Sequence, residues 1–537
     1  MQAQNENAQE KLFLRDLGRG IFARLTKEFE DYTGLSLRGE RKLLIAQELT
    51  LMEQDFFAGL DRAYAIARDS FRNGRFSAAR MRHFNPKMDA KLKQASEKWP
   101  QSADVWIIGG LMVQNQVAGL KTLYGLNQEE GTILDVLGSA TSLSLGAQNP
   151  YLSIFDRVED ALGMRDNICS AYHPSARQAF FLEKIAALYP ASEKIPLSIH
   201  SESSGAIVNS VSIECALAFI EKRGNGIDAK ILAVDGTWAG GHGSAREATG
   251  FGVADFEQTR SGRPLYVDRC LPCPTKDKKQ EFLSILRQKI KDGAAAGLYI
   301  EPDIIGDAGV AVVDPEVLKE ALAILKQEAL PVIADCVQQI GRTGPSYWGE
   351  TTEAVLKDYP WLIITAAKSA SNGQPFGFTI MPKEIADCAY PRSHLSTNQY
   401  NGPLLRAIGV SEFMTDSGFQ AWLSAKSTKI EEMAEEYNIP LGHGGLRGKY
   451  MNRGVYVGSN DNVKLAQIAL LVEDGILTGA LPQSLRYQPM LMEYASTNSL
   501  VAQIIFRRVG EVMKGNISPE VETIYNSLQG EQSGLAR

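Results

Sequence analysis

The sequence predicts an α/β protein whose large domain holds a mainly parallel sheet, with a smaller α+β C-terminal domain and an extra helical segment at the N-terminus. From Gly131, short apolar runs alternate with amphipathic helical patterns, and such alternation is typical of parallel sheets covered on both faces. Before about residue 100, apolar residues recur at helical spacing with polar residues between them. The 537 residues are too many for one core, so we expect several domains.

The N-terminal helices are predicted from EKLFLRDLGRGIFARLTKEF and ERKLLIAQELTLMEQDFFAGLDRAYAIARDSF, whose apolar residues lie three and four positions apart. Because these helices are apolar on one side only, we expect them to pack on the rest of the subunit. The predicted division is a helical extension over 1–105, the N-terminal part of the small domain over 106–160, the large domain over 161–425 and the C-terminal small domain over 426–537.

The large domain is expected to alternate strands and helices in chain order. The predicted helices are 175–188, 206–223, 275–292 and 315–327, and the predicted strands are 195–200, 229–236, 297–302, 330–336, 361–367 and 376–381. In the C-terminal part, we expect helices over 465–474 and 497–514 and short strands such as GVYVG at 454–458.

The composition is that of an ordinary soluble protein, with 44% hydrophobic and 22% charged residues. The formal net charge of -7 argues against nucleic acid or an anionic membrane as a partner. The N-terminal residues lack the apolar core of a signal peptide, so we expect a cytoplasmic protein. Six cysteines do not form a disulfide framework, and the lone CxxC of Cys270 and Cys273 is expected in a surface loop, with no metal site.

Two residues carry the main functional prediction. One apolar strand ends on Asp335, and a later strand delivers Lys368 just past its end, so a carboxylate and an amine should meet at the same rim of a parallel sheet. Pyridoxal phosphate requires such a pair. A lysine holds it as a Schiff base, and an acidic residue keeps its pyridine nitrogen protonated so that the ring acts as an electron sink.

The residues around both positions resemble the class III aminotransferases of the fold type I pyridoxal phosphate enzymes. DCVQQIGRTG at 335–344 is similar to the family's DEVQTGxGRTG, and the residues after Lys368 resemble its KxxxxGxPxG. Several motifs follow the family's order from about Gly131 to about Leu491. The resemblance implies the fold type I architecture and transamination, with Lys368 as Schiff-base lysine and proton shuttle and Asp335 as partner of the pyridine nitrogen.

The same resemblance implies further cofactor contacts. Gln338 falls on the glutamine that binds the 3′ oxygen, and Val337 on the residue that packs against one ring face. Ser203 and Ser204 precede a helix whose free amides could hold the phosphate. Trp238 falls on the aromatic residue that stacks over the ring.

Phosphate binding across a dimer interface is also implied, because SHLSTNQYNGP resembles the family's STFGGNP. In the family, a threonine of this motif crosses the dimer interface and binds the phosphate in the neighbouring subunit. Thr397 is the candidate for this role, or Ser396 in a shifted register. If this holds, the active unit is a homodimer with shared active sites.

Substrate recognition is predicted at Arg486, which falls on the family arginine that binds the carboxylate of glutamate or 2-oxoglutarate. Asp307 stands where related enzymes have a glutamate that pairs with this arginine. Residues 139–149 should line the substrate pocket. An amino donor and a keto acceptor are therefore the expected partners.

Other functions remain compatible with the sequence. The family scaffold also hosts racemases and decarboxylases, which differ in pocket residues. A nucleotide-binding oxidoreductase would need a GxGxxG motif after a first strand, and the sequence lacks one there. A catalytically inactive binding protein on the same fold is disfavoured because both Lys368 and Asp335 are present.

Overall fold

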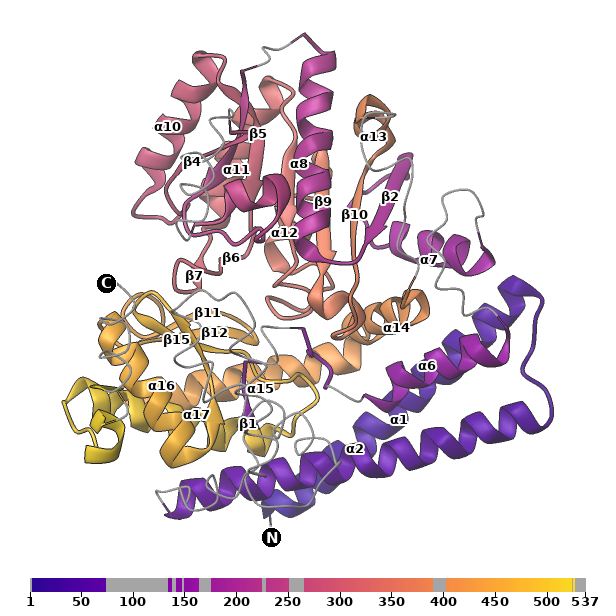
Figure 1. Ribbon diagram of the computed structural model, residues 1–537, viewed down its shortest axis with the longest axis vertical. Coiled ribbons are helices and arrows are strands. Elements are labelled where there is room, and N and C mark those ends of the chain that lie inside the picture. The colour runs from indigo at the N-terminus through magenta and orange to yellow at the C-terminus, as the bar shows by residue number, and fades with distance from the viewer. Residues whose placement is uncertain are drawn as a thin grey trace, which may run out of the picture.

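The computed structural model describes residues 2–73, 134–137, 142–146, 149–163, 175–224, 228–250, 265–389, 402–523 and 525–526. Its largest element is a 7-stranded sheet with the order β2-β10-β9-β8-β5-β3-β4 (Figure 1). β10 runs antiparallel to both neighbours, and the other pairs are parallel. The strands are β2 (Leu197–Glu202), β3 (Lys230–Val234), β4 (Val267–Leu271), β5 (Ala295–Ile300), β8 (Val332–Asp335), β9 (Leu362–Ala367) and β10 (Gly377–Pro382).

Helices cover this sheet, which confirms the predicted α/β class. Every residue of β5, β8 and β9 is buried, because strands covered on both faces have no solvent side. α8 (Gly205–Lys222) crosses one face and packs on most of the strands (Figure 1). The other helices of this part are α7 (Ala176–Ala186), α10 (Lys279–Lys291), α11 (Pro315–Gln327), α12 (Glu350–Ala354), α13 (Lys383–Ala389) and α14 (Leu404–Thr415).

The C-terminal part is a smaller α+β unit. Its 4-stranded antiparallel sheet has the order β11-β12-β15-β14. β1 (Leu134–Asp135) pairs with β13 (Ile476–Leu477), so a segment that precedes the large sheet joins this part. Its elements are α15 (Ser417–Glu436), β11 (Leu446–Lys449), β12 (Asn452–Tyr456), α16 (Asn460–Asp474), β13, β14 (Gly479–Leu481), β15 (Ser484–Tyr487) and α17 (Ala495–Met513).

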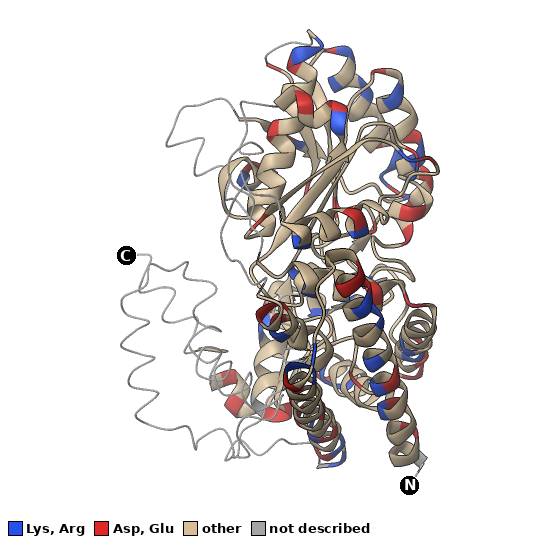
Figure 2. Ribbon diagram, turned by 90° about the vertical axis from the view of Figure 1, so that its right-hand side faces the viewer, with Lys and Arg blue, Asp and Glu red and all other residues tan. Residues whose placement is uncertain are grey.

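The two N-terminal helices, α1 (Gln2–Thr33) and α2 (Glu40–Asn73), lie along the base of the molecule (Figure 1). They pack against α6 (Pro150–Ala161), α14 and α17, as their one-sided pattern predicts. Leu14, Ile21, Leu25 and Phe29 form the buried stripe of α1. Acidic and basic residues are mixed on the face seen in Figure 2.

The remainder of the predicted helical extension lies outside the described residues. Among the helices that the structure does describe, none is both long and apolar enough to span a bilayer.

The prediction that the CxxC pair lies in a surface loop is wrong. Cys270 lies within β4, and Cys273 is buried just beyond it. β4 was missed because VDRCL mixes charged and apolar residues without a clear apolar run, as an edge strand can. Both thiols are free.

Candidate active site

Asp335 and Lys368 lie at the carboxyl ends of neighbouring parallel strands. Asp335 is the last residue of β8 and is paired with Thr365 of β9, whereas Lys368 follows β9 and begins the short 3-10 helix η3 (Lys368–Ser371). Strands of one sheet lie about 4.8 Å apart, so both side chains start from the same rim. Lys368 has a φ of 51°, which is unusual for a residue other than glycine and is typical of functional sites.

Asp335 is held by donors from several elements. Its Oδ2 atom accepts hydrogen bonds from Asn209 Nδ2 at 2.9 Å and from the hydroxyl of Tyr299, and its Oδ1 atom accepts one from the Val337 amide at 2.9 Å. Burial raises the pKa of this carboxyl, and the three donors oppose that shift. Asn209 also donates to the carbonyl of Ala239 at 2.8 Å, which ties the loop of Trp238 to Asp335. Neither Tyr299 nor Asn209 was predicted from the sequence.

The Lys368 amine is half-buried, and within the described part of the chain it makes no hydrogen bond or ion pair. Burial lowers its pKa to about 8, and the positive charge of Arg486 adds to this effect, whereas Asp335, Glu301 and Asp307 oppose it. An ordinary lysine has a pKa of about 10.4. Near neutral pH, this amine is therefore far more available as a nucleophile than a solvent-exposed one.

The amino end of α8 reaches the same rim. Ser204 caps this helix by accepting a hydrogen bond from the amide of Ile207 at 3.4 Å, and Ser203 precedes it. Gly205 fits closely, since a Cβ there would lie 3.1 Å from Val337 Cγ1 and 3.3 Å from the Cβ of Ala367. The first-turn amides of α8 thus lie beside the ends of β8 and β9, where they can bind an anion.

Trp238 lies in the loop after β3 and is 37% exposed, which is unusual for so large an aromatic side chain. Its loop lies against α8, because Gly240 has a φ of 135° and a Cβ there would lie 2.4 Å from that of Ala206. The other predicted phosphate residue, Thr397, lies outside the described residues, as does Ser396.

Arg486 forms the centre of a second group of predicted residues. Its Nη2 atom lies 3.2 Å from Oδ1 of Asp307, so the shorter acid does reach the arginine. Its Nη1 atom donates to Oε1 of Gln338 at 3.1 Å. Glu301, which the sequence did not single out, accepts from the Gly306 amide at 2.6 Å and from Gln338 at 3.4 Å. Burial and the nearby Asp335 hold the pKa of Glu301 well above its usual range.

Part of the segment 139–149 lies against the turn of Lys368. Asn372 accepts a hydrogen bond from the Leu145 amide at 2.9 Å and donates to the carbonyl of Gly146 at 2.7 Å. The hydroxyls of Ser144 and Ser369 are also hydrogen-bonded. The structure thus brings residues 142–146 to the site.

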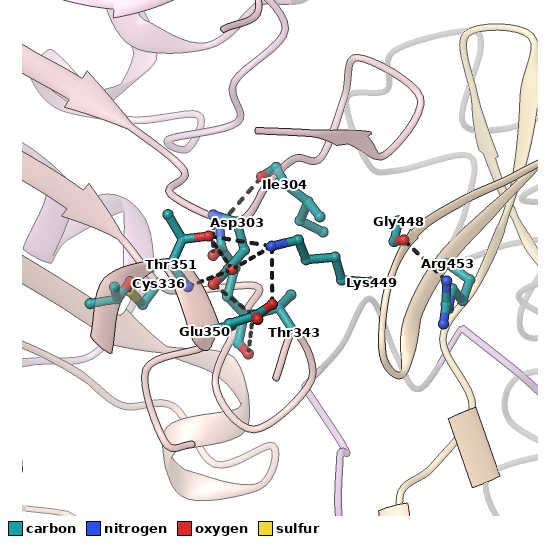
Figure 3. Close-up of polar contacts among 11 residues, drawn as sticks. Asp303, Ile304, Cys336, Thr343, Glu350, Thr351, Gly448, Lys449 and Arg453 are labelled. Carbon is teal, nitrogen blue, oxygen red and sulfur yellow. Dashed lines mark hydrogen bonds and ion pairs between the residues drawn. The ribbon is translucent and has the colours of Figure 1, made fainter. Parts of the chain in front are cut away.

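A buried cluster around Asp303 joins the large sheet to the C-terminal part, as Figure 3 shows. Asp303 accepts hydrogen bonds from the Thr351 amide at 2.9 Å, from the Thr351 hydroxyl at 2.6 Å and from the Thr343 hydroxyl at 3.0 Å. Lys449 of β11 pairs with it at 3.6 Å. Asp303 immediately precedes β6 (Ile304–Ile305), which forms a hairpin with β7 (Ala311–Val312), and Asp307 lies in the turn of this hairpin.

These residues fit pyridoxal phosphate. The amine of Lys368 has no other partner among the described residues, and the buried carboxylate of Asp335 lies at the same rim. The amino end of α8 offers backbone amides for the phosphate, and the loop of Trp238 is held by Asn209, which also donates to Asp335. An amine, an acid and an anion site therefore lie at one rim of the sheet, as the cofactor requires.

Comparison with known proteins identifies the family. The family model "Aminotransferase class-III" matches residues 119–503. The chain is 28% identical to the succinylornithine transaminase of Photorhabdus laumondii over 270 residues, which cover 48% of this chain and 64% of that protein. It is 26% identical to the mitochondrial alanine–glyoxylate aminotransferase 2 of Pongo abelii over 364 residues, which cover 61% and 66%. The matches thus span just under two thirds of these relatives.

Solved structures show the same fold. The omega-transferase from Vibrio fluvialis superposes with a TM-score of 0.60 at 19% identity, covering 72% of this chain and 96% of that one. The ornithine aminotransferase of Toxoplasma gondii superposes with a TM-score of 0.58 at 18% identity, covering 71% and 87%. Because the family model matches more than half of this chain, the chain belongs to the class III aminotransferase family, whose fold it shares.

Proposed function

We propose that this protein is a pyridoxal phosphate-dependent aminotransferase that moves an amino group between an amino acid or amine and a keto acid or aldehyde. The observation that carries this proposal is the Lys368 amine, with its pKa lowered to about 8, at the same sheet rim as the buried Asp335. When bound, the cofactor supplies an electron sink for the substrate's α-carbon. Lys368 would hold the cofactor covalently and, once released, would move the proton to and from that α-carbon.

The other residues would hold and orient the cofactor. Asp335, fixed by three donors, would keep the ring nitrogen protonated, because a buried carboxylate favours a nearby positive charge. Val337 would cover one ring face and Trp238 the other, and Gln338 would bind the 3′ oxygen. Ser203, Ser204 and the first turn of α8 would bind the phosphate, together with Thr397 of a second subunit.

Glutamate and 2-oxoglutarate are the proposed common substrate pair. Arg486 would bind a carboxylate of this pair, since guanidinium and carboxylate can form two parallel hydrogen bonds. Its ion pair with Asp307 would satisfy the arginine when a substrate without that carboxylate is bound. Relatives named as succinylornithine and acetylornithine aminotransferases support an amino acid as the other substrate.

A homodimer, the domain division predicted from the sequence and a cytoplasmic location complete the proposal. The pairing of β1 with β13 supports assigning residues near 134 to the small domain. The cysteines that the structure describes are all free thiols, as a reducing compartment favours.

The test is a spectrum of the purified protein loaded with pyridoxal phosphate. We expect a visible band that glutamate converts to a near-ultraviolet band while 2-oxoglutarate is released in equal amount. Lys368→Ala should lose the band, and Lys383→Ala, a surface control, should keep it. A protein that stays colourless with added cofactor would refute the enzyme assignment. Racemisation or carbon dioxide release without 2-oxoglutarate would refute transamination.

A further inference from the structure

A cavity of about 610 Å³ lies beside the β6–β7 turn, and Asp307 and Ala308 of this turn form part of the cavity wall. Its other walls come from the end of β4, the start of α10, β11 and the residues before β15. The volume is within the range of about 300–1,000 Å³ that small-molecule sites occupy. Leu271, Pro272 and Pro482 give it apolar surface, and charged side chains from separate elements converge on it.

Arg447 is the most informative residue in this wall. Its guanidinium lies over the ring of Tyr456, 5.0 Å from the ring centre, and among the described residues no carboxylate pairs with it. The Nε atom is buried and has no hydrogen-bond partner there. Gly309, with a φ of 72°, makes room for this side chain, because a Cβ would lie 2.8 Å from Arg447 Nη1. The structure therefore places here a partly desolvated cation that has no counter-charge within the described ranges.

The half-buried cations in the cavity wall are Arg269 and Arg447. Arg269 is half-buried like Arg447, and one of its nitrogens donates to the carbonyl of Thr249 at 2.9 Å. Asp307 is also in the wall, but its charge is already paired with Arg486. Asp235, Lys278 and Glu281 are exposed at the rim, where water and salt screen their charges. Arg447 is thus a partly buried cation that has no paired acid among the described residues, and an anion can pair with it.

The two thiols in the cavity wall carry no negative charge that would repel an anion. Burial raises the pKa of Cys270 to about 11 and that of Cys273 to about 12, so both remain neutral at physiological pH. They therefore add weakly polar, uncharged surface beside the arginines.

We infer that this cavity is a second binding site, separate from Lys368, for a small organic anion that presents a carboxylate to Arg447. The planar guanidinium matches a carboxylate in two parallel hydrogen bonds, and the apolar walls suit a short carbon chain. A phosphate group could use the same donors, so the experiment compares the two anions.

The probe is radiolabelled succinate, measured by equilibrium dialysis against the cofactor-loaded protein. The background is the double variant Arg486→Gln with Asp307→Asn, which removes the proposed substrate-carboxylate contact without leaving an unpaired acid in the cavity wall, so that binding at the second site is counted alone. We expect about one succinate per chain to remain bound to this double variant. Adding Arg447→Gln should weaken this binding about tenfold or more, because a hydrogen-bonded charge is lost. Adding Arg223→Gln, an exposed arginine that also stacks on aromatic rings, should leave it unchanged.

Thiol labelling locates the ligand without any substitution. Succinate should slow the reaction of Cys270 with N-ethylmaleimide and leave that of Cys388, a half-buried thiol on α13, unchanged. Absence of succinate binding to the double variant, or binding that survives the addition of Arg447→Gln at full strength, would overturn the inference. Equal protection by the uncharged succinamide would overturn it too, and protection by phosphate alone would overturn the carboxylate assignment.

Discussion

Replacing Asp303 by alanine should open the junction between the β6–β7 hairpin and the C-terminal sheet (Figure 3). The substitution leaves the Thr351 amide, two threonine hydroxyls and the Lys449 ammonium without the buried acceptor that they share. A hydrogen bond to a charged group contributes about 1.5–3 kcal/mol, whereas Lys449 is partly exposed and keeps Glu350 as a second partner at 3.2 Å. Because these contributions overlap at one carboxylate, we expect a local cost of about 4 kcal/mol.

Lys449→Met should cost much less. The Lys449 side chain is 19% exposed and lies 3.6 Å from Asp303, so its loss should cost about 1 kcal/mol. Asp314, which caps α11 through the amides of Glu316 and Val317, is a matched control, and Asp314→Ala should also cost about 1 kcal/mol.

Hydrogen exchange measured by mass spectrometry on the peptide that contains the Thr351 amide tests this ranking. A local cost of about 4 kcal/mol corresponds to exchange roughly a thousandfold faster, and about 1 kcal/mol to roughly fivefold. If Asp303→Ala changed exchange no more than Lys449→Met does, the acceptor role assigned to Asp303 would be wrong.

Three further predictions concern the active site. Because the pKa of Lys368 is lowered to about 8, incorporation of pyridoxal phosphate into cofactor-free protein should accelerate as pH rises through about 8 and then level off. Arg486→Gln removes a neighbouring positive charge, so it should move the midpoint of this pH profile to higher pH. An unchanged midpoint would contradict the effect assigned to Arg486. Asp335→Asn should keep the visible band but slow the glutamate half-reaction on the order of hundredfold, as stopped-flow absorbance would show, and a near-normal rate would argue against its role at the ring nitrogen. Arg486→Lys should raise the KM for glutamate about tenfold to hundredfold and leave amines without any carboxylate nearly unaffected. Equal effects on both would exclude a carboxylate contact.

The elements that were predictable from the sequence have strong local signals. β8 and β9 are continuous apolar runs, as strands buried on both faces are. The helix at Pro315–Gln327 was predicted at both ends, because Asp314 and Pro315 give a clear start. β4 lacked such a signal, and the antiparallel direction of β10 depends on partners elsewhere in the chain.

Residues of the candidate site were predictable where a motif marks them, as with Asp335 and Lys368. The supporting contacts were not, because they join segments far apart in the sequence. Tyr299 and Asn209 donate hydrogen bonds to Asp335 from β5 and α8, and the residues around them in the sequence form no motif that predicts these contacts. The reach of Asp307 to Arg486 likewise depends on how the β6–β7 turn packs on the C-terminal sheet.

The most direct test is to find the lysine that carries the cofactor. The protein loaded with pyridoxal phosphate would be reduced with borohydride, digested and analysed by mass spectrometry. Lys426 is an internal comparison, because burial also lowers its pKa, to about 7, yet its amine donates to the carbonyls of Leu491 at 2.8 Å and Glu493 at 2.6 Å. We predict that the cofactor mass lies on Lys368 alone. Its appearance on Lys426, or on no lysine, would contradict the assignment of Lys368 and Asp335 as the site of chemistry.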